Sequence, residues 1–516
     1  MMKVTALCFM VLFATSLVFA QPTPSVVADQ VPNDGPVYYQ HEKNVARASN
    51  GALMVAWQDQ AGTGGQAVYS TYDDVFMIWN PPIPISAASV QADEVALVAD
   101  NQGRIHATWK QDDGVISWQV YYAKYEGNAF STPVRVSSND TLDNEESSIE
   151  VDSNGRIFVV WNTDDEPDGD EWILCSISAD GGATWSVPDT LSSPDGIIQG
   201  TSITNARVNL YAGTAGKIAA AWHEDYPTRE REIYVNQYDG AQWQGSVVVS
   251  DTMAFVSRHW YPTICLDSQD NVHVIYSDDQ SGSDPRHILH TMKAWSAPQW
   301  PAVWDTVDVD TAQDYQSVTS VVDQNDYIHV AYRREIPGTA LGLDEIAYRR
   351  SEDGGQTWTD PVTVSRPDQD AGYCTFAARI FGDRAELSWR ESSDPLVNDQ
   401  DTTAILYGYV DVASGIGNDK PAVAENFQLH QNYPNPFNPT TQINFVIAKK
   451  GKYKLSVFSL LGQKVKTLLS GDLLPGAKSV NWNGIDQAGH SVASGIYFYK
   501  LEGEGVSLSR KMILIR

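Results

Sequence analysis

The stretch that decides the fold runs Val95-Ala-Leu-Val-Ala-Asp-Asn-Gln-Gly-Arg-Ile-His-Ala-Thr-Trp109. Residues alternate along both halves, as at Ile105, Ala107 and Trp109, with the period of a β-strand that has one buried face. The turn from Asp100 to Gly103 suits a tight hairpin in which glycine takes a positive φ. The stretch therefore predicts two antiparallel strands, the second ending in an aromatic residue.

The same hairpin recurs along residues 44–413. Clear copies occupy residues 148–161, 263–276 and 319–332, and looser copies end at Trp57, Trp222 and Trp389. Successive strand-end aromatic residues are 52, 52, 61, 54, 56 and 57 positions apart. A third and a fourth strand follow each aromatic residue, for example within residues 120–137 and 232–250. Four antiparallel strands in about 50 residues are typical of a β-propeller blade.

The number of blades depends on how the ring closes. The seventh repeat ends in residues 404–413 with a third strand but no obvious fourth. Residues 23–34 are similar to residues 132–143, which include a fourth strand, so the N-terminal segment can complete the last blade and remove a free sheet edge. We therefore favour seven blades, with six blades and an extra hairpin as the alternative.

Residues 1–20 have the pattern of a secretory signal peptide: a basic start at Lys3, an apolar stretch over residues 6–19, and small residues before Gln21. An N-terminal membrane anchor is the alternative. No later segment has the roughly 18 unbroken apolar residues of a membrane helix. The expected mature chain is exported, carries no transmembrane segment, and begins with a propeller over residues 21–413, joined by a linker (414–425) to a second domain (426–516).

Charge and cysteine content limit the partners. The net charge is −30, and it divides into +1 at Lys3 in residues 1–20, −37 over residues 21–423 and +6 over residues 424–516. So acidic a surface repels phosphate backbones, which excludes nucleic acid as a partner. The cysteines Cys175, Cys265 and Cys374 fit no metal motif and cannot all pair, so we expect buried free thiols and no required cofactor.

Two turns share the form Ser-x-Asp-x-Gly-x-Thr-Trp. They comprise Ser178, Asp180, Gly182, Thr184 and Trp185, and Ser351, Asp353, Gly355, Thr357 and Trp358. The form resembles the Asp-box (BNR) repeat of sialidase-like propellers. The resemblance implies a structural turn on the face opposite the ligand site, with no catalytic role. The arginine motif of sialidases is not matched, because Arg379-Ile380 is followed by Phe381.

The expected ligand face offers three candidate sites. The first consists of the residues two positions after each strand-end aromatic: Asp59, Gln111, Thr163, Glu224, Asp278, Arg334 and Glu391. We interpret them either as solvated loop starts or as a ring of carboxylates that binds a ligand. In the second case, Glu224, Asp278 and Glu391 are the catalytic candidates. The cluster Arg258, His259, Trp260 and Tyr261, expected just before the first strand of the fifth blade, can stack on a sugar and bond its hydroxyls. Asp164, Asp165, Asp168 and Asp170 are oxygen ligands suited to Ca²⁺, although their spacing is not that of an EF-hand.

The C-terminal region has its own signature. The run Asn432-Tyr-Pro-Asn-Pro-Phe-Asn-Pro-Thr-Thr441, the spacing of Trp482, Gly484, Asp486 and Gly489, and the basic-apolar end from Lys511 to Arg516 resemble the C-terminal sorting domain of the type IX secretion system. From the residues alone the segment reads as a small immunoglobulin-like β-sandwich. The resemblance implies export through the periplasm to the cell surface or the medium, with the type IX machinery as partner; an accessory module of the same fold is the alternative.

The sequence thus predicts an all-β protein, a propeller followed by an immunoglobulin-like sandwich. Its leading function is binding of a glycan or an extracellular protein. A diverged exo-glycosidase of the sialidase superfamily and a structural surface component are the alternatives.

Overall fold

The computed structural model describes the following residues: 24–31, 43–59, 65–73, 78–87, 90–112, 114, 118–138, 142–165, 170–192, 204–225, 231–250, 258–279, 286–301, 304–309, 317–336, 343–366, 369–380, 382–392, 403–412, 428–429, 432, 435, 437–447, 451–459, 462–473, 476–503 and 506–515. The predicted signal peptide lies outside them. Within them the chain is all-β, with one short 3₁₀ turn, η2 (Thr214–Gly216), and no α-helix. No helix of this part of the chain is long and apolar enough to cross a membrane.

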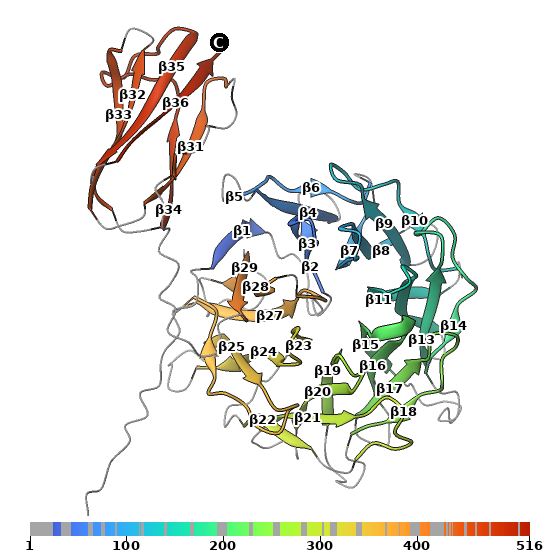
Figure 1. Cartoon of the computed structure of the whole chain (residues 1–516). Coiled ribbons are helices and arrows are strands. Elements are labelled where there is room, and N and C mark those ends of the chain that lie inside the picture. The colour runs from blue at the N-terminus through green and yellow to red at the C-terminus, as the bar shows by residue number, and fades with distance from the viewer. Residues whose placement is uncertain are drawn as a thin grey trace, which may run out of the picture.

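Seven antiparallel sheets succeed one another between residues 25 and 411 among the described residues, arranged around a ring in Figure 1. We number them as blades 1 to 7. Blade 1 contains β2 (Val45–Arg47), β3 (Leu53–Asp59), β4 (Gln66–Asp73), β5 (Ile78–Trp79) and β6 (Ile83–Pro84). Blade 2 contains β7 (Ala92–Ala99), β8 (Ile105–Asp112), β9 (Trp118–Tyr125) and β10 (Val134–Arg135). Blade 3 contains β11 (Asp143–Val151), β12 (Ile157–Asp165), β13 (Asp170–Ser178) and β14 (Asp189–Thr190).

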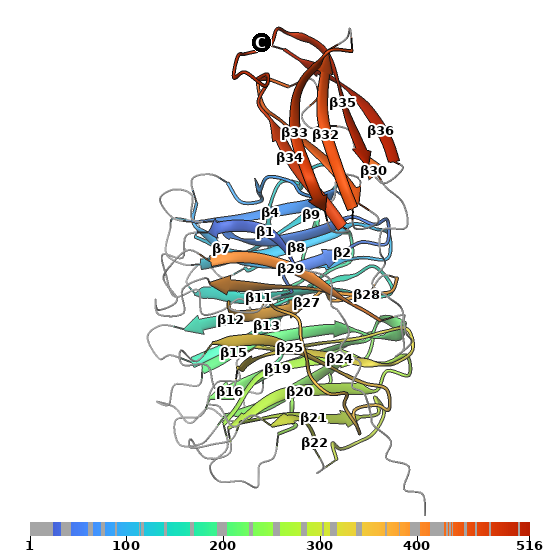
Figure 2. The ribbon, with the colours of Figure 1, turned by 90° about the vertical axis from the view of Figure 1, so that its left-hand side faces the viewer.

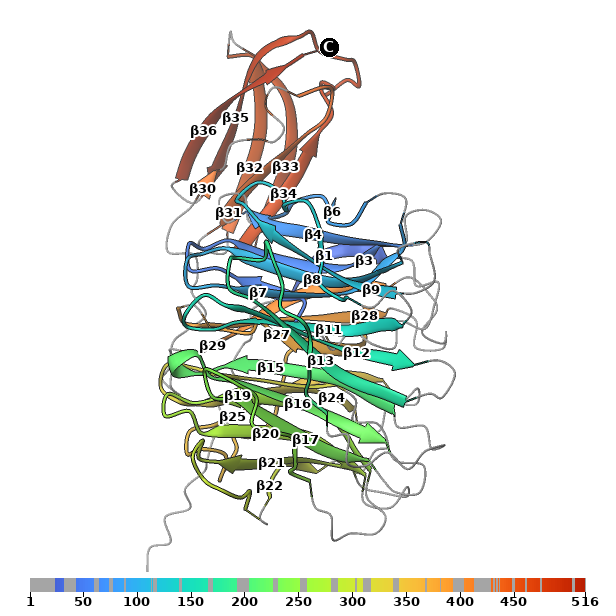
Figure 3. The same ribbon diagram turned by 90° about the vertical axis from the view of Figure 1, so that its right-hand side faces the viewer.

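The remaining blades repeat this order. Blade 4 contains β15 (Thr204–Ala212), β16 (Ile218–Asp225), β17 (Glu232–Tyr238) and β18 (Val247–Val248). Blade 5 contains β19 (Arg258–Leu266), β20 (Val272–Asp279), β21 (Arg286–Lys293) and β22 (Asp305–Val309). Blade 6 contains β23 (Val318–Val322), β24 (Ile328–Glu335), β25 (Asp344–Ser351) and β26 (Val362–Thr363). In each blade the first strand lies nearest the axis, and Figures 2 and 3 show the blades from the side.

Blade 7 draws on both ends of the domain. Its order is β1 (Ser25–Val31), β29 (Thr403–Asp411), β28 (Arg384–Ser392) and β27 (Asp370–Phe376). Ser25 pairs with Tyr407 and Val26 with Leu406, so the N-terminal strand supplies the missing outer strand, as the sequence predicted. Trp79 of blade 1 donates an indole hydrogen bond to the Ser25 hydroxyl at 3.1 Å, which ties the closing strand to the next blade.

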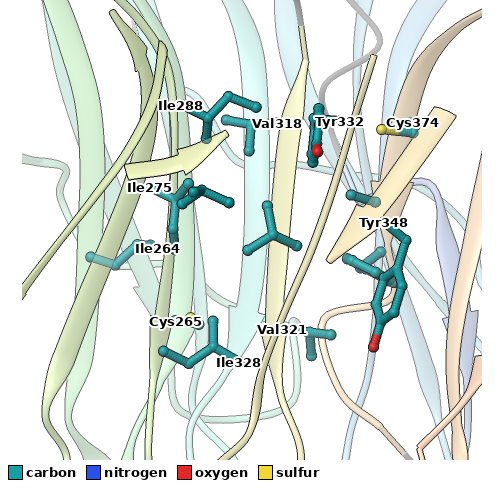
Figure 4. Close-up of a cluster of buried hydrophobic side chains, with 14 of the residues drawn as sticks. Ile264, Cys265, Ile275, Ile288, Val318, Val321, Ile328, Tyr332, Tyr348 and Cys374 are labelled. Atoms are coloured by element: carbon teal, nitrogen blue, oxygen red, sulfur yellow. The ribbon is translucent and has the colours of Figure 1, made fainter. Parts of the chain in front are cut away.

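Apolar side chains fill the spaces between neighbouring blades. Ile264 and Ile275 of blade 5, Val321 and Ile328 of blade 6, and Cys374 of blade 7 belong to one such cluster, drawn in Figure 4. All three described cysteines are buried free thiols, which confirms the prediction. The strand-end aromatics Trp57, Trp109, Trp161, Trp222, Tyr276, Tyr332 and Trp389 are at most 2% exposed. The aromatic residues that recur in the sequence are therefore the residues that recur in the buried core of each blade.

One face of the propeller carries the hairpin turns between first and second strands and the Asp-box turns, and we call it the turn face. In the first Asp-box, an Asp180 carboxylate oxygen accepts from the Thr184 amide at 2.9 Å, the other oxygen accepts from the Thr184 hydroxyl, and the Ser178 hydroxyl accepts from the Gly182 amide. Ser351, Asp353, Gly355 and Thr357 repeat the pattern. Trp185 packs edge-on against Tyr122 of blade 2, and Trp358 against His290 of blade 5, so both turns join neighbouring blades.

Buried histidines form a second repeated device on the turn face. The Nδ1 atoms of His106 and His329 each lie 2.7 Å from a tyrosine hydroxyl, while their Nε2 atoms face Asp100 and Asp323. Burial lowers the pKa of both imidazoles. Burial and the neighbouring His273 lower the pKa of His290 to about 3.

The C-terminal domain is a two-sheet sandwich. One sheet has the order β30 (Gln428–Leu429), β31 (Thr441–Ile447), β34 (Gly476–Trp482), and the other the order β33 (Lys464–Leu473), β32 (Gly451–Ser459), β35 (Gly495–Gly503), β36 (Val506–Leu514). Ile443 and Phe445 of the first sheet and Leu455, Tyr499 and Leu501 of the second share one buried core. The motif Asn-Pro-Phe holds the last strand, since the Ile513 amide donates to the Asn435 side chain at 2.8 Å and the Phe437 amide to the Ile513 carbonyl at 3.0 Å.

Removal of residues 21–31 should open blade 7. It deletes every described hydrogen bond of β1 and exposes the edge of β29. It also removes Val27 and so uncovers Ile405 and Tyr407, which share one core with it. Each large apolar side chain uncovered costs about 1.5–3 kcal/mol, so we expect a loss of several kcal/mol in unfolding free energy, measured by urea denaturation. A transition midpoint equal to that of the intact mature chain would contradict closure by β1.

The buried histidines should make the protein less stable in mild acid. Each has its folded-state pKa below its unfolded value of about 6.5, so below that pH the unfolded chain binds protons that the folded chain does not. The histidines therefore contribute fully to the free energy of unfolding above about pH 6.5, and this contribution is lost progressively as the pH falls toward 3. Asp93 and Glu145, whose pKa values are raised, act in the opposite sense. Urea denaturation at intervals from pH 7.5 to 4 measures the combined effect of these groups on the free energy of unfolding. A urea midpoint that rises on acidification would contradict the expected loss of stability.

Candidate functional site

The first strands of several blades share a β-bulge near their beginning. In blade 2, Asp93 pairs with Lys110 but Ala96 pairs with Thr108, so β7 holds one residue more than β8 over this interval. The same shift occurs in blades 3, 4, 5 and 7. At the bulge or its equivalent, five residues other than glycine have a left-handed backbone: Glu94 (φ 55°), Glu146 (49°), Tyr261 (51°), Ser317 (61°) and Tyr373 (55°).

We call the face that carries these five residues the bulge face. It is opposite the turn face, because the bulges lie where second strands end and third strands begin. A left-handed conformation costs an L-residue about 1–2 kcal/mol, and bulges re-aim side chains next to functional sites. Five such residues on one face mark it as the candidate site.

Blades 2 and 3 give this face a carboxyl side. The Lys110 ammonium lies 2.8 Å from one oxygen of Glu94 and 3.3 Å from Glu145, and the Glu146 amide donates to the other Glu94 oxygen at 2.7 Å. Burial and the charge of Glu94 raise the pKa of Asp93 to about 6 and that of Glu145 to about 7. These two carboxyl groups can hold a proton near neutral pH.

Blades 4 to 7 give it a tyrosine side. The Tyr261 ring of blade 5 meets His223 of blade 4 edge to face, with 6.1 Å between ring centres. In blade 7, the Arg390 guanidinium lies 5.8 Å from the centre of the Tyr373 ring. Tyr373 is also close to Arg333: burial opposes protonation of Arg333, but Asp344, Asp370 and Tyr373 together raise the pKa of its guanidinium.

The proposed sugar-binding cluster is only partly as the sequence predicted. Arg258, His259, Trp260 and Tyr261 do not precede the first strand of blade 5 but begin it, because β19 extends to pair with Ser277 and Asp279. His259 is 1% exposed, with its Nδ1 3.2 Å from Asp278, so it is not a surface contact. Tyr261 is half-buried on the bulge face. The side chains of Arg258 and Trp260 lie outside the described residues.

The residues two positions after the strand-end aromatics are not solvated loop starts, because the second strands continue past the aromatic residue. Trp109, Trp222 and Trp389 donate indole hydrogen bonds of 2.8 to 3.2 Å to the side chains two positions on, which are Gln111, Glu224 and Glu391. Glu224, Asp278 and Glu391 are 2–3% exposed. The structure does not show them meeting one another: Glu224 bonds Trp222, Asp278 faces His259, and Glu391 also bonds Arg366.

The proposed Ca²⁺ ligands fall on the hairpin between β12 and β13. The backbone of Asp165 pairs with that of Asp170, and Asp164 pairs with Glu171. Asp168 and the side chains of Asp164, Asp165 and Asp170 lie outside the described residues. Among the side chains that the structure does describe, no group of three or more His, Cys, Asp or Glu is placed to hold a metal.

Sequence reasoning named Tyr261 as a binding residue but missed Glu94, Glu146, Ser317 and Tyr373, and it predicted none of the five left-handed conformations. Glu94, Glu146, Tyr261 and Ser317 each stand 15 positions before the strand-end aromatic of their blade, and Tyr373 stands 16 before Trp389. That constant offset is the signal that could have found them. It stays hidden because the five positions share no residue type.

Residues 431–515 match the family model described as the secretion system C-terminal sorting domain. This confirms the type IX sorting signal, and the protein is exported by that route to the cell surface or the medium. No curated protein matches the chain.

Among solved structures, the chain is similar to a polysaccharide lyase of family PL25, an ulvan lyase bound to -[GlcA(1-4)Rha3S]-. The TM-score is 0.56 at 13% identity, over 75% of this chain and 97% of that one. A second ulvan lyase structure has a TM-score of 0.54 at 13% identity, over 77% and 98%. The α-L-arabinanase of Penicillium chrysogenum complexed with arabinobiose has 0.41 at 15% identity, over 61% and 91%. The likeness to the two ulvan lyase structures shows the propeller fold and is not specific to sialidases.

Glu224 should tolerate loss of its charge but not loss of its oxygen. Glu224→Gln keeps an acceptor for the Trp222 indole, whereas Glu224→Ala leaves a buried N–H without one, at a cost of about 1–3 kcal/mol. We therefore expect Glu224→Gln to unfold near the wild-type urea midpoint and Glu224→Ala well below it. Equal midpoints for the two variants would show that the indole contact is not the role of Glu224.

Proposed function

We propose that the propeller is an extracellular glycan-binding module that holds its ligand on the bulge face. The observation that carries the proposal is the pair of left-handed tyrosines, Tyr261 and Tyr373, on the first strands of blades 5 and 7. A bulky residue with positive φ is a rare outlier, and such strain clusters at sites that bind ligands.

The chemistry of the face suits a sugar. Tyrosine rings offer an apolar surface for a pyranose ring and a hydroxyl for its polar edge. Lys110, Arg390 and the carboxyl groups of blades 2 and 3 add donors and acceptors of both signs. His223 positions the Tyr261 ring from the adjacent blade. Arg258 and Trp260, next to Tyr261 on β19, stay in the proposed site.

Two likenesses support this proposal. The ulvan lyase whose fold the chain shares was solved with a sugar ligand, which is a property of that protein and makes a glycan the first ligand class to test here. The two Asp-box turns support a sialidase-like origin for the propeller, with their hydrogen bonds confined to the turn face.

A second candidate function is cleavage of a glycan by acid–base chemistry. The favouring observation is that Asp93 and Glu145, with pKa values near 6 and 7, can donate a proton near neutral pH. A diverged glycosidase of this kind would use Asp93 or Glu145 as its acid; Glu224 and Glu391 already accept hydrogen bonds from buried indoles.

A glycan array probed with the mature chain, with and without Ca²⁺, tests the proposal. We expect binding to a defined set of glycans, weakened at least tenfold in each of Tyr261→Ala and Tyr373→Ala, since loss of a buried aromatic contact costs roughly 2 kcal/mol or more. Trp260→Ala tests the cluster named from the sequence. Tyr327→Ala is the matched control, because Tyr327 is a half-buried tyrosine in a hairpin turn of the opposite face.

The same preparation, incubated with a panel of polysaccharides and chromogenic glycosides, separates binding from catalysis. Release of reducing ends or of an unsaturated product that is lost in Glu145→Gln but not in Tyr327→Ala would establish the enzyme instead. Absence of both binding and turnover would overturn the glycan proposal and favour a protein ligand or a structural surface role.

A further inference from the structure

The four-stranded sheet of the sorting domain has an outer face of unusual composition. Register places Phe458 of β32 opposite Lys464 of β33 on one side and opposite Phe498 of β35 on the other, and Phe498 opposite Lys511 of β36. Directly paired residues lie on the same face of a sheet, so the four side chains form one row, Lys464–Phe458–Phe498–Lys511, across all four strands. We call the surface around this row the lysine–phenylalanine face.

Burial shows that the row is on the outside of the sandwich. Tyr497 and Tyr499 flank Phe498 along β35 and are buried in the core, so Phe498 belongs to the opposite side. Lys464 and Lys511 are exposed, and Phe458 and Phe498 are half-buried. The next row pairs Ile496, which is 38% exposed, with Ile513. Adjacent exposed apolar side chains rimmed by charge mark interaction surfaces.

By sequence and backbone register, the described strands of the other sheet have no such row. Its positions that alternate with the buried Ile443 and Phe445 are Gln442 and Asn444, which pair with Asn481 and Ser479. All four are uncharged. The four strands of the sheet that carries the phenylalanines hold seven basic and two acidic residues, so they carry +5 of the +6 in residues 424–516. Of these, Lys500 lies 2.7 Å from Glu502, the next residue but one on β35.

We propose that the lysine–phenylalanine face docks on an acidic protein surface of the export machinery. Charge complementarity carries the choice of occupant. An acidic partner attracts this basic face, while it repels the propeller and adjoining linker, which carry about −37. One acidic surface can therefore bind the sorting domain without binding the propeller. The phenylalanine pair supplies the apolar centre of the contact, with lysines at its rim.

Export of the full-length chain in a host with type IX secretion tests the proposal. The variant Lys464→Gln/Lys511→Gln removes two charges from the face, and Gln442→Glu/Asn481→Asp changes the net charge of the domain equally on the other sheet. We expect the first variant, and Phe498→Ser, to accumulate in the periplasm with export lowered at least roughly fivefold, as expected when rim charges and a central aromatic are removed. The second variant should be exported like the wild type.

Thermal unfolding of the periplasmic protein verifies that each variant is folded, and Lys464→Arg/Lys511→Arg should restore export. Normal export of both the lysine and phenylalanine variants would overturn the proposal. An equal loss of export in Lys464→Gln/Lys511→Gln and Gln442→Glu/Asn481→Asp would also overturn the proposal, because the net charge of the domain alone would then determine export. Binding of the purified wild-type chain to anionic phospholipid vesicles, lost in Lys464→Gln/Lys511→Gln, would assign the face to a lipid surface instead; dimers lost in the same variant would assign it to a second copy.

Discussion

Closure of the ring is the constraint on which the rest of the propeller depends. A blade buries both faces of its sheet only when it has a neighbour on each side, so a break anywhere leaves two apolar faces in water. The chain meets this need by pairing its first strand with its last propeller strand, β1 with β29. Val27 and Val45 from the beginning of the domain and Ile405 from its end then share one core between blades 7 and 1.

The strand-end aromatic residue links this constraint to the sequence. Its large ring fills the space between blades, and an indole buried there needs an acceptor for its N–H. Gln111, Glu224 and Glu391 supply that acceptor two positions later, and Asn144 does so for Trp161. At Gln111, Glu224 and Glu391, the polar residue that suggested a carboxylate ring for a ligand is therefore explained by burial of a core tryptophan.

The repeat, the hairpins, the closing strand and the Asp-box turns could be predicted because each is local or periodic: alternation reports a buried face, and glycine reports a positive φ. The site could not. Glu94, Tyr261 and Tyr373 take the left-handed conformation although their residue types disfavour it, and each lies at a bulge where the first strand holds one residue more than the second. The contact of Tyr261 with His223 joins two blades, and no spacing within one repeat reports it.

For the proposed glycan-binding role, the charge of the propeller bears on which glycans would reach the bulge face. A domain near −37 repels a polyanion at long range, but at physiological salt this repulsion is screened beyond about 8 Å. Within that distance, the cations Lys110 and Arg333 are already held by Glu94 and Asp344. A neutral or weakly charged glycan meets neither obstacle, whereas an anionic one must compete with these carboxylates for its counter-ions. In the proposed role the arrangement favours neutral sugars, and affinity for an anionic polymer is expected to increase with ionic strength as the repulsion is screened.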